Sequence, residues 1–129
     1  MKKTLMGLIV ITTLLSGSFV WGTQTSYAGA NKLIDITTIG NGTTGYLDGS
    51  TGGYAKICLK EAPGGANVAI YDNDGGSNNP VIRSSSFMAN GSCYTFNAQP
   101  YVDGTDNNAE FIVITSRDII GTIKFELWD

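Results

Sequence analysis

Short segments in which apolar and polar residues alternate dominate this chain after its first thirty residues. In residues 54–60, for example, Ala55, Ile57 and Leu59 alternate with lysine and cysteine. A period of two places successive side chains on opposite faces of a β-strand, which is then half buried. No later segment carries a helical apolar stripe of useful length. The pattern therefore predicts an all-β domain.

About seven such segments follow one another at roughly ten-residue spacing, separated by turns rich in glycine. They are predicted at residues 33–39, 54–60, 67–71, 81–87, 92–97, 109–115 and 119–128. This repetition is typical of a single-domain antiparallel β-sandwich, Greek-key or immunoglobulin-like, here covering residues 31–129. The immunoglobulin comparison concerns architecture and implies no function.

Residues 1–28 have the pattern of a cleaved signal peptide: a positive start, an apolar run over residues 5–15 and small residues near its end. Cleavage after Ala28 and cleavage after Ala30 both fit. The apolar run has about eleven residues, too few for a membrane-spanning helix. We therefore expect a secreted, extracellular protein of bacterial type without membrane insertion.

Composition excludes several classes of function. The chain contains no histidine, which removes Ser-His-Asp and Cys-His nucleophile systems and His-ligated zinc. Loss of two lysines with the signal peptide would change the net charge from −3 to −5. An acidic chain without a basic cluster is poorly suited to binding nucleic acid. We predict no nucleic-acid partner.

Two cysteines, Cys58 and Cys93, are expected to form a disulfide, because an exported protein meets an oxidising environment. The bridge would close a loop of about 35 residues and contribute roughly 4 kcal/mol. Strand alternation points both side chains away from the core. In an immunoglobulin-like order their two strands are neighbours, so we expect a cross-strand bridge on the outer face of one sheet.

Long polar loops are predicted to emerge from one end of the domain, if the strands alternate in direction: residues 40–53, 72–80 and 98–108. Loops on a rigid scaffold often carry binding residues. Tyr46, Tyr101, Asp103 and Asp106 lie in two of these loops and are our candidates for binding. An aromatic ring beside Asn and Asp suits a glycan and suits a protein partner equally. The alternative is that the loops are simply solvated.

The segment Asp72-Asn73-Asp74-Gly75-Gly76 suggests a calcium ligand, because Ca²⁺ prefers several oxygens on a sharply turning backbone. It does not match the EF-hand pattern. A Ca²⁺ site would therefore need Asp72 and Asp74 together with Asp48 or with the acids of the third loop. The alternative is a turn in which Asp and Asn bond their own backbone.

For catalysis, only carboxylate pairs remain, in the manner of a glycosidase. A domain of about 100 residues rarely encloses the deep cleft that such an enzyme needs. We therefore predict a small secreted non-catalytic protein that binds an extracellular glycan or protein. The alternative is a secreted effector, either an antimicrobial or toxin-like protein or an inhibitor of an extracellular enzyme.

Overall fold

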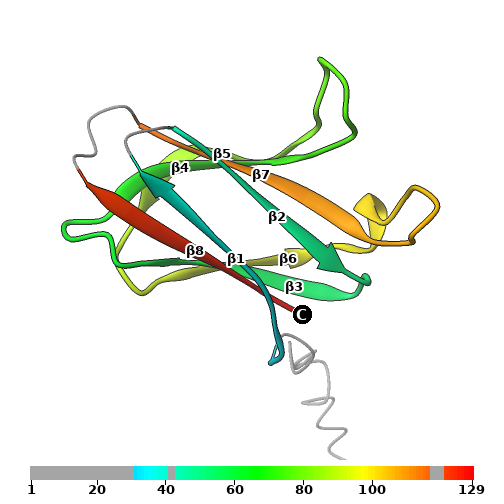
Figure 1. Cartoon of the computed structure of the whole chain (residues 1–129), viewed down its shortest axis with the longest axis horizontal. Coiled ribbons are helices and arrows are strands. Elements are labelled where there is room, and N and C mark those ends of the chain that lie inside the picture. The colour runs from blue at the N-terminus through cyan, green and yellow to red at the C-terminus, as the bar shows by residue number, and fades with distance from the viewer. Residues whose placement is uncertain (1–30, 41–42, 117–120) are drawn as a thin grey trace, which may run out of the picture.

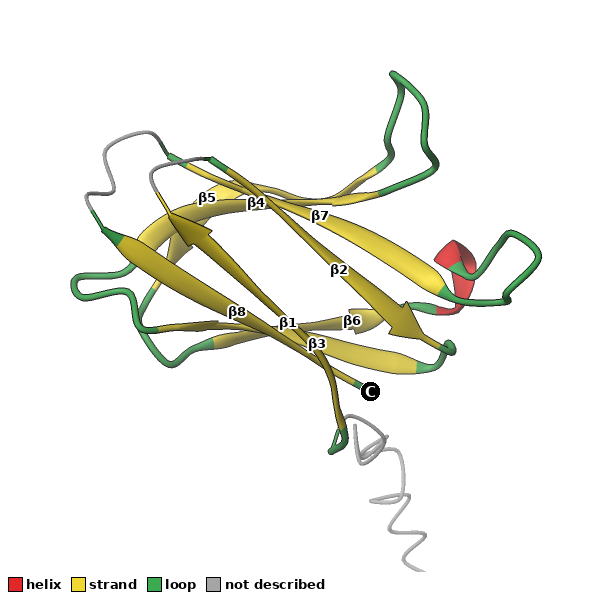
Figure 2. Ribbon diagram, viewed as in Figure 1, coloured by secondary structure: helices red, strands yellow, loops and turns green. Residues whose placement is uncertain are grey.

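The computed structural model describes residues 31–40, 43–116 and 121–129. This part of the chain is all-β, with two antiparallel sheets of four strands and no α-helix (Figure 2). Its elements are β1 (Leu33–Gly40), β2 (Thr44–Ser50), β3 (Tyr54–Lys60), β4 (Ala66–Asp72), β5 (Val81–Met88), β6 (Cys93–Asn97), the 3-10 helix η3 (Gln99–Tyr101), β7 (Ala109–Thr115) and β8 (Thr122–Trp128).

The predicted signal peptide, residues 1–28, lies outside the described residues. Within the described ranges, no helix has the length and apolar character needed to cross a membrane.

The chain passes repeatedly between the two sheets. One sheet has the order β1-β8-β3-β6 and the other β2-β7-β4-β5, and every pair is antiparallel. Strands β3 and β6 are neighbours, as expected. Strand β8, however, lies between β1 and β3, whereas immunoglobulin constant domains place their first two strands side by side. Figure 1 shows the two layers and the crossing connections.

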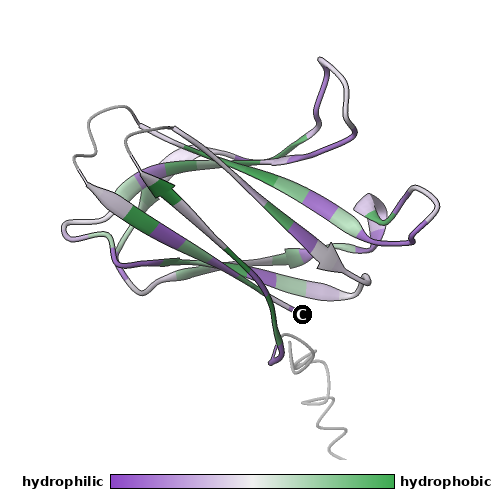
Figure 3. Cartoon of the chain, in the orientation of Figure 1, coloured by the Kyte–Doolittle hydropathy of each residue, from purple (hydrophilic) through white to green (hydrophobic). Residues whose placement is uncertain are grey.

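Apolar side chains from both sheets form one core. The larger fully buried ones include Ile57, Leu59, Phe125 and Leu127 from one sheet and Val68, Ile70, Phe111 and Val113 from the other. These are the positions that strand alternation directs inward. Figure 3 shows the hydropathy of the residues along the strands. The predicted inward faces of residues 54–60 and 67–71 are therefore confirmed. For the strand predicted at 119–128, residues 119 and 120 lie outside the described residues, and the inward positions Ile123, Phe125 and Leu127 are confirmed.

Strand β2 was not predicted, and treating residues 40–53 as one long loop was wrong. Its two glycines caused the error. A Cβ at Gly45 would lie 2.8 Å from Thr37 Cγ2, because β1 packs closely over β2. Gly49 has φ +103°, at the register shift between Asp48 and Ser50. These glycines mark a close approach and a β-bulge, where the sequence pattern indicated turns.

The predicted disulfide is confirmed. Cys58 and Cys93 are bonded and stand directly opposite each other on β3 and β6, with their Cα atoms 3.9 Å apart. The neighbouring backbone bond runs from the Leu59 N–H to the Ser92 carbonyl. Cys58–Cys93 is therefore a non-hydrogen-bonded pair, the closer of the two antiparallel pairings. Both side chains lie on the outer face, opposite to Ile57 and Leu59.

Truncation of one core ring should destabilise the fold more than truncation of an exposed one. Phe111 is fully buried, whereas Phe87 on edge strand β5 is 61 % exposed. We expect Phe111→Ala to lower the free energy of unfolding by about 3–5 kcal/mol, because it leaves a cavity. Phe87→Ala should cost less than about 1 kcal/mol. Urea unfolding of the purified protein measures both, and equal losses would contradict the assigned core.

Candidate functional site

One end of the two sheets gathers six acidic side chains, three of them in loops and three on strands. The β2–β3 turn, the β4–β5 loop and the β6–β7 loop all emerge at the right-hand end in Figure 1. The described turns β3–β4 and β5–β6 lie at the opposite end. Residues 72–80 and 98–108 therefore share one end, as predicted, although residues 44–50 are strand. We call this the loop end.

Tyr101 anchors the β6–β7 loop to the core. Its ring lies 6.4 Å from the Phe96 ring and 6.4 Å from the Phe111 ring, centroid to centroid, in edge-to-face contact. Such pairs are worth about 0.5–1.5 kcal/mol beyond area burial. Helix η3, which carries Tyr101, begins where the Gln99 N–H donates to Asn97 Oδ1. Tyr101 is thus half buried against the core, while Tyr46 is 61 % exposed.

Beyond η3 the loop folds back on itself and directs Asp106 towards the sheet. The Asp103 N–H donates to the Asn108 carbonyl, and the Asn108 N–H donates to Asp106 Oδ1. Gly104 and Asn107 adopt positive φ, 70° and 56°, conformations that glycine and asparagine tolerate. The loop is therefore held by its own backbone.

A β-bulge places Asp48 beside the same loop. The Asp48 N–H donates to Asp35 Oδ2 from β1, at 2.9 Å, and the following Gly49 carries the irregular backbone. In the sheet register, Asp48 stands directly opposite Glu110 of β7. Like charges in this position destabilise a sheet. The arrangement thus costs stability in the absence of a partner.

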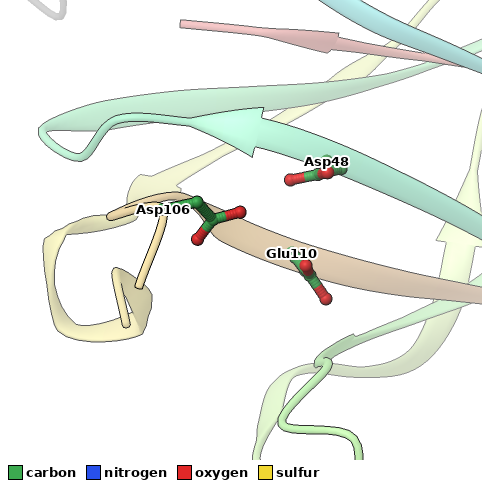
Figure 4. A group of neighbouring side chains, drawn as sticks. All are labelled: Asp48, Asp106 and Glu110. Carbon is green, nitrogen blue, oxygen red and sulfur yellow. The ribbon is translucent and has the colours of Figure 1, made fainter. Parts of the chain in front are cut away.

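Three carboxylates converge at this point: Asp48, Asp106 and Glu110, each with an oxygen within 4.8 Å of the others. Figure 4 shows Asp48 on β2 and Asp106 on the loop facing each other, with Glu110 on β7 beside them. Glu110 also accepts a hydrogen bond from Asn73 Nδ2, 3.3 Å to Oε2. We call these three residues the acidic triad.

A second acidic group comprises Asp72, Asp74 and Asp103. Asp72 is 5 % exposed. Burial, the negative charge of Asp74, a hydrogen bond with Asp74 and the charge of Asp103 together raise the pKa of Asp72 to about 6. Partial desolvation also raises the pKa of Asp103, followed by its hydrogen bond with Asp74 and the charges of Asp74 and Asp106. A protonated Asp72 can donate to the Asp74 carboxylate.

Asp72 lies on the opposite face of the sheet from Asp48 and Glu110. Asp72 pairs with Phe111, whose side chain is in the core, so Asp72 points inward. Asp48 and Glu110 alternate with buried residues and point outward. The predicted calcium ligands Asp48, Asp72 and Asp74 are therefore divided between the two groups. The predicted proximity of Asp72 and Asp74 to Asp103 is present in the electrostatic contacts.

Glu110 was not identified from the sequence. It lies in the run Ala109–Thr115, which is otherwise almost wholly apolar and reads as a buried central strand. The available signal was its charge: a lone acidic residue in such a strand must point out of the core. Its closeness to Asp48 depends on the pairing of β2 with β7, and β2 was not predicted.

A separate cavity of about 420 Å³ lies near the start of β1, lined by Lys32, Ile34, Gly49, Thr51, Gly52, Gly53, Tyr54 and Asp129. Asp129 Oδ2 accepts hydrogen bonds from the N–H and the hydroxyl of Thr51, which holds the β2–β3 turn against the end of β8. None of the six acids of the two groups lines this cavity.

Comparison with known proteins gives one family. The family model described as "YndA coiled coil domain" matches residues 28–126. A relative, described as uncharacterized protein YndA, from Bacillus subtilis (strain 168), is 32 % identical over 78 residues. This alignment covers 59 % of the present chain and 59 % of the relative. No solved structure matches the chain. Despite the words of the family description, the described residues form strands and no α-helix.

The buried carboxyl of Asp72 should make stability depend on pH. Its folded pKa of about 6 exceeds the ordinary 3.8, so the folded state binds the proton more tightly than the unfolded state. Stability from this group is therefore present below pH 4 and is lost as the pH rises to about 6. Asp72→Asn should be more stable than the wild type at pH 7, on the order of 2 kcal/mol, and the difference should shrink towards pH 4.

Urea unfolding at pH 4, 5, 6 and 7 measures this difference. Glu61→Gln, an exposed acid-to-amide change at the opposite end, serves as the matched control and should leave the pH profile intact. A difference between Asp72→Asn and wild type that is constant over the whole range would contradict the assigned protonation of Asp72.

Proposed function

We propose that this chain, which belongs to the YndA coiled coil domain family, is a small secreted non-catalytic binding protein that uses its loop end to engage an extracellular glycan or protein. The observation that carries the proposal is the gathering of six carboxylates at that end, from β2, β4, β7 and two loops. Mutual repulsion makes this unfavourable for a free domain. A ligand that offsets the repulsion supplies a reason for the arrangement.

Secretion is supported by the sequence of residues 1–28 and by the disulfide, which is typical of oxidising compartments. We also infer that the fold is a β-sandwich, since the inward faces of two four-stranded sheets share one core. The order β1-β8-β3-β6 argues against the immunoglobulin subtype.

A non-catalytic role is favoured by the position of Asp72. Its raised pKa would suit a general acid, with Asp74 as the ionised partner. At 5 % exposure, however, its side chain lies on the core side of the sheet and offers almost no surface to a substrate. The outward-facing triad, by contrast, is accessible, but its three carboxylates share one surface. It therefore does not provide the pair of one protonated and one ionised carboxyl, set apart from each other, that glycosidases use.

Calcium is our first candidate for the ligand of the acidic triad. Its donors are carboxylate oxygens, which Ca²⁺ prefers, and they are close enough to share one ion. Backbone bonds on either side hold them, from the Asn73 N–H to the Glu110 carbonyl and from Asp103 to Asn108. Relief of the repulsion between Asp48 and Glu110 would add to the binding free energy.

Calcium should therefore stabilise the protein. At a hundredfold excess over the dissociation constant, a ligand specific to the folded state adds about 2.7 kcal/mol. For a domain of this size, the melting temperature should rise by roughly 10 °C. Thermal melts in EDTA, in CaCl₂ and in MgCl₂ measure the effect, with magnesium as the control for charge screening. Identical melts in the three buffers would refute the calcium ligand.

Two variants locate the ion. Asp48→Asn/Glu110→Gln should abolish the calcium shift, because it removes two of the three negative charges of the triad. Asp72→Asn/Asp74→Asn, with the same change in net charge, should retain it, because Asp72 lies on the other face of the sheet and Asp74 is not one of the triad carboxylates. The reverse result would move the site to the Asp72 group.

Binding itself is tested on whole cells. Fluorescently labelled protein should remain on cells of the producing organism after washing, and Asp48→Asn/Glu110→Gln should reduce retention by roughly tenfold if two hot-spot groups are lost. Protease treatment of the cells distinguishes a protein target, and periodate treatment a glycan. Wild-type retention no greater than that of the double variant would refute a binding module. Growth inhibition in the same cultures would favour the effector alternative.

A further inference from the structure

A row of apolar and aromatic side chains crosses the outer face of the β2-β7-β4-β5 sheet. The register places Tyr46 opposite Ile112, Ile112 opposite Tyr71, and Tyr71 opposite Val81. All four strands contribute one residue, so the row is about 14 Å long, three strand spacings. Tyr46 and Val81, at its two ends, are 61 % and 56 % exposed, whereas Ile112 between them is only 8 % exposed. An outer face in contact only with water usually carries polar residues.

The centre of the row is hollowed. A cavity of about 170 Å³ is lined by Tyr71, Ser77, Asn79, Ile112 and Ile114. The Oδ1 atom of Asn79 is buried and, among the described residues, has no hydrogen-bond partner. A buried acceptor of this kind is costly unless a donor reaches it. The cavity thus offers apolar walls to a ligand that brings an apolar group.

The acidic triad lies one outward position further along the same face. Asp48 follows Tyr46 by two residues on β2, and Glu110 precedes Ile112 by two residues on β7. Ion pairs in the described residues join Lys124 to Glu61 and Glu126, on the other sheet, and none reaches the triad. The face therefore combines an apolar row with an adjoining negative charge.

We propose that this face docks a basic peptide segment of an extracellular protein, with an apolar side chain in the cavity between Tyr71 and Ile112 and a lysine or arginine at the acidic triad, where it would compete with Ca²⁺. The proposal deepens the binding function proposed above by naming the partner class and the surface. Charge complementarity fixes the position of the peptide along the face, because the acidic triad lies one outward position from the apolar row.

The composition of the row favours a peptide over a glycan. Sugar faces stack on aromatic rings, which would suit Tyr46 and Tyr71. Ile112, Ile114 and Val81 have no flat face for stacking, but they pack well against aliphatic side chains. The triad carboxylates can accept hydrogen bonds from sugar hydroxyls, but a neutral sugar leaves their mutual repulsion in place, whereas an ammonium or guanidinium group neutralises it.

The test is a titration of ¹⁵N-labelled protein, recovered after expression of the full chain, followed by NMR. The probe is a capped hexapeptide of alternating lysine and leucine, compared with its glutamate–leucine counterpart and with an N-acetylglucosamine hexamer. We expect the lysine peptide to shift the amide signals of Tyr46, Tyr71, Val81 and Ile112, with a dissociation constant on the order of 0.1–1 mM. The other two probes should leave these signals in place.

Matched variants distinguish binding at the row from non-specific binding. Tyr46→Ser/Val81→Ser should weaken the lysine peptide roughly tenfold, as loss of an aromatic and an apolar anchor does. Phe87→Ser is the control, because Phe87 is as exposed as Tyr46 but pairs with Asn67 at the far end of the sheet. Asp48→Asn/Glu110→Gln should weaken binding and flatten its salt dependence.

Three outcomes would overturn the inference: no shifts at millimolar lysine peptide, equal binding by the Tyr46→Ser/Val81→Ser variant, or shifts along the row caused by the sugar hexamer instead. Thermal melts of each variant establish that it is folded. If cells retain the protein but the peptide does not bind, the proposed binding function stands and this partner class falls. If the peptide binds at the row but cells do not retain the protein, the docking face is supported and the proposed binding to cells is not.

Discussion

Burial of one face of each sheet in a common core is the interaction on which the rest of this structure depends. Phe111 and Val113 must face the opposite sheet, and the two-residue period of the strand then forces Glu110 and Ile112 outward. The same rule applied to β2 puts Leu47 in the core and Tyr46 and Asp48 outside. The outer surface of the β2-β7-β4-β5 sheet is therefore a direct consequence of core packing.

The acidic loop end shows how a fold can hold an arrangement that electrostatics opposes. Asp48 stands opposite Glu110, and Asp72 is buried beside Asp74, although each pair repels. Main-chain hydrogen bonds, such as that from the Asn73 N–H to the Glu110 carbonyl, fix the backbone regardless of side-chain charge. Tyr101 fixes the third loop through its contact with Phe111. Core packing thus offsets the loss of stability that repulsion between the carboxylates causes.

Placement of the apolar row and the acidic triad on one sheet face links the two proposals made for this protein. A partner seated on Tyr46 and Ile112 would come within one strand position of Asp48 and Glu110. A cation at the triad and a peptide on the row would therefore affect each other's binding. The strands of this face belong to residues 28–126, which the family model matches, so the surface lies within the shared region.

Alternation in the sequence by itself determined the strand class and the inward residues of β3, β4 and β8, since each follows from a local period of two. The outward cross-strand disulfide was predicted from the same alternation together with the expected export of the chain and an immunoglobulin-like strand order. It also predicted that residues 72–80 and 98–108 share one end. Only the tertiary structure decided that Gly45 and Gly49 lie in a strand, because the close approach of β1 over Gly45 and the bulge at Gly49 cannot be distinguished locally from turns. Because β2 pairs with β7, Asp48 lies opposite Glu110 on the outer face of the sheet. Asp72 lies on the inner face of the same sheet, so Asp48 and Asp72 cannot share one site.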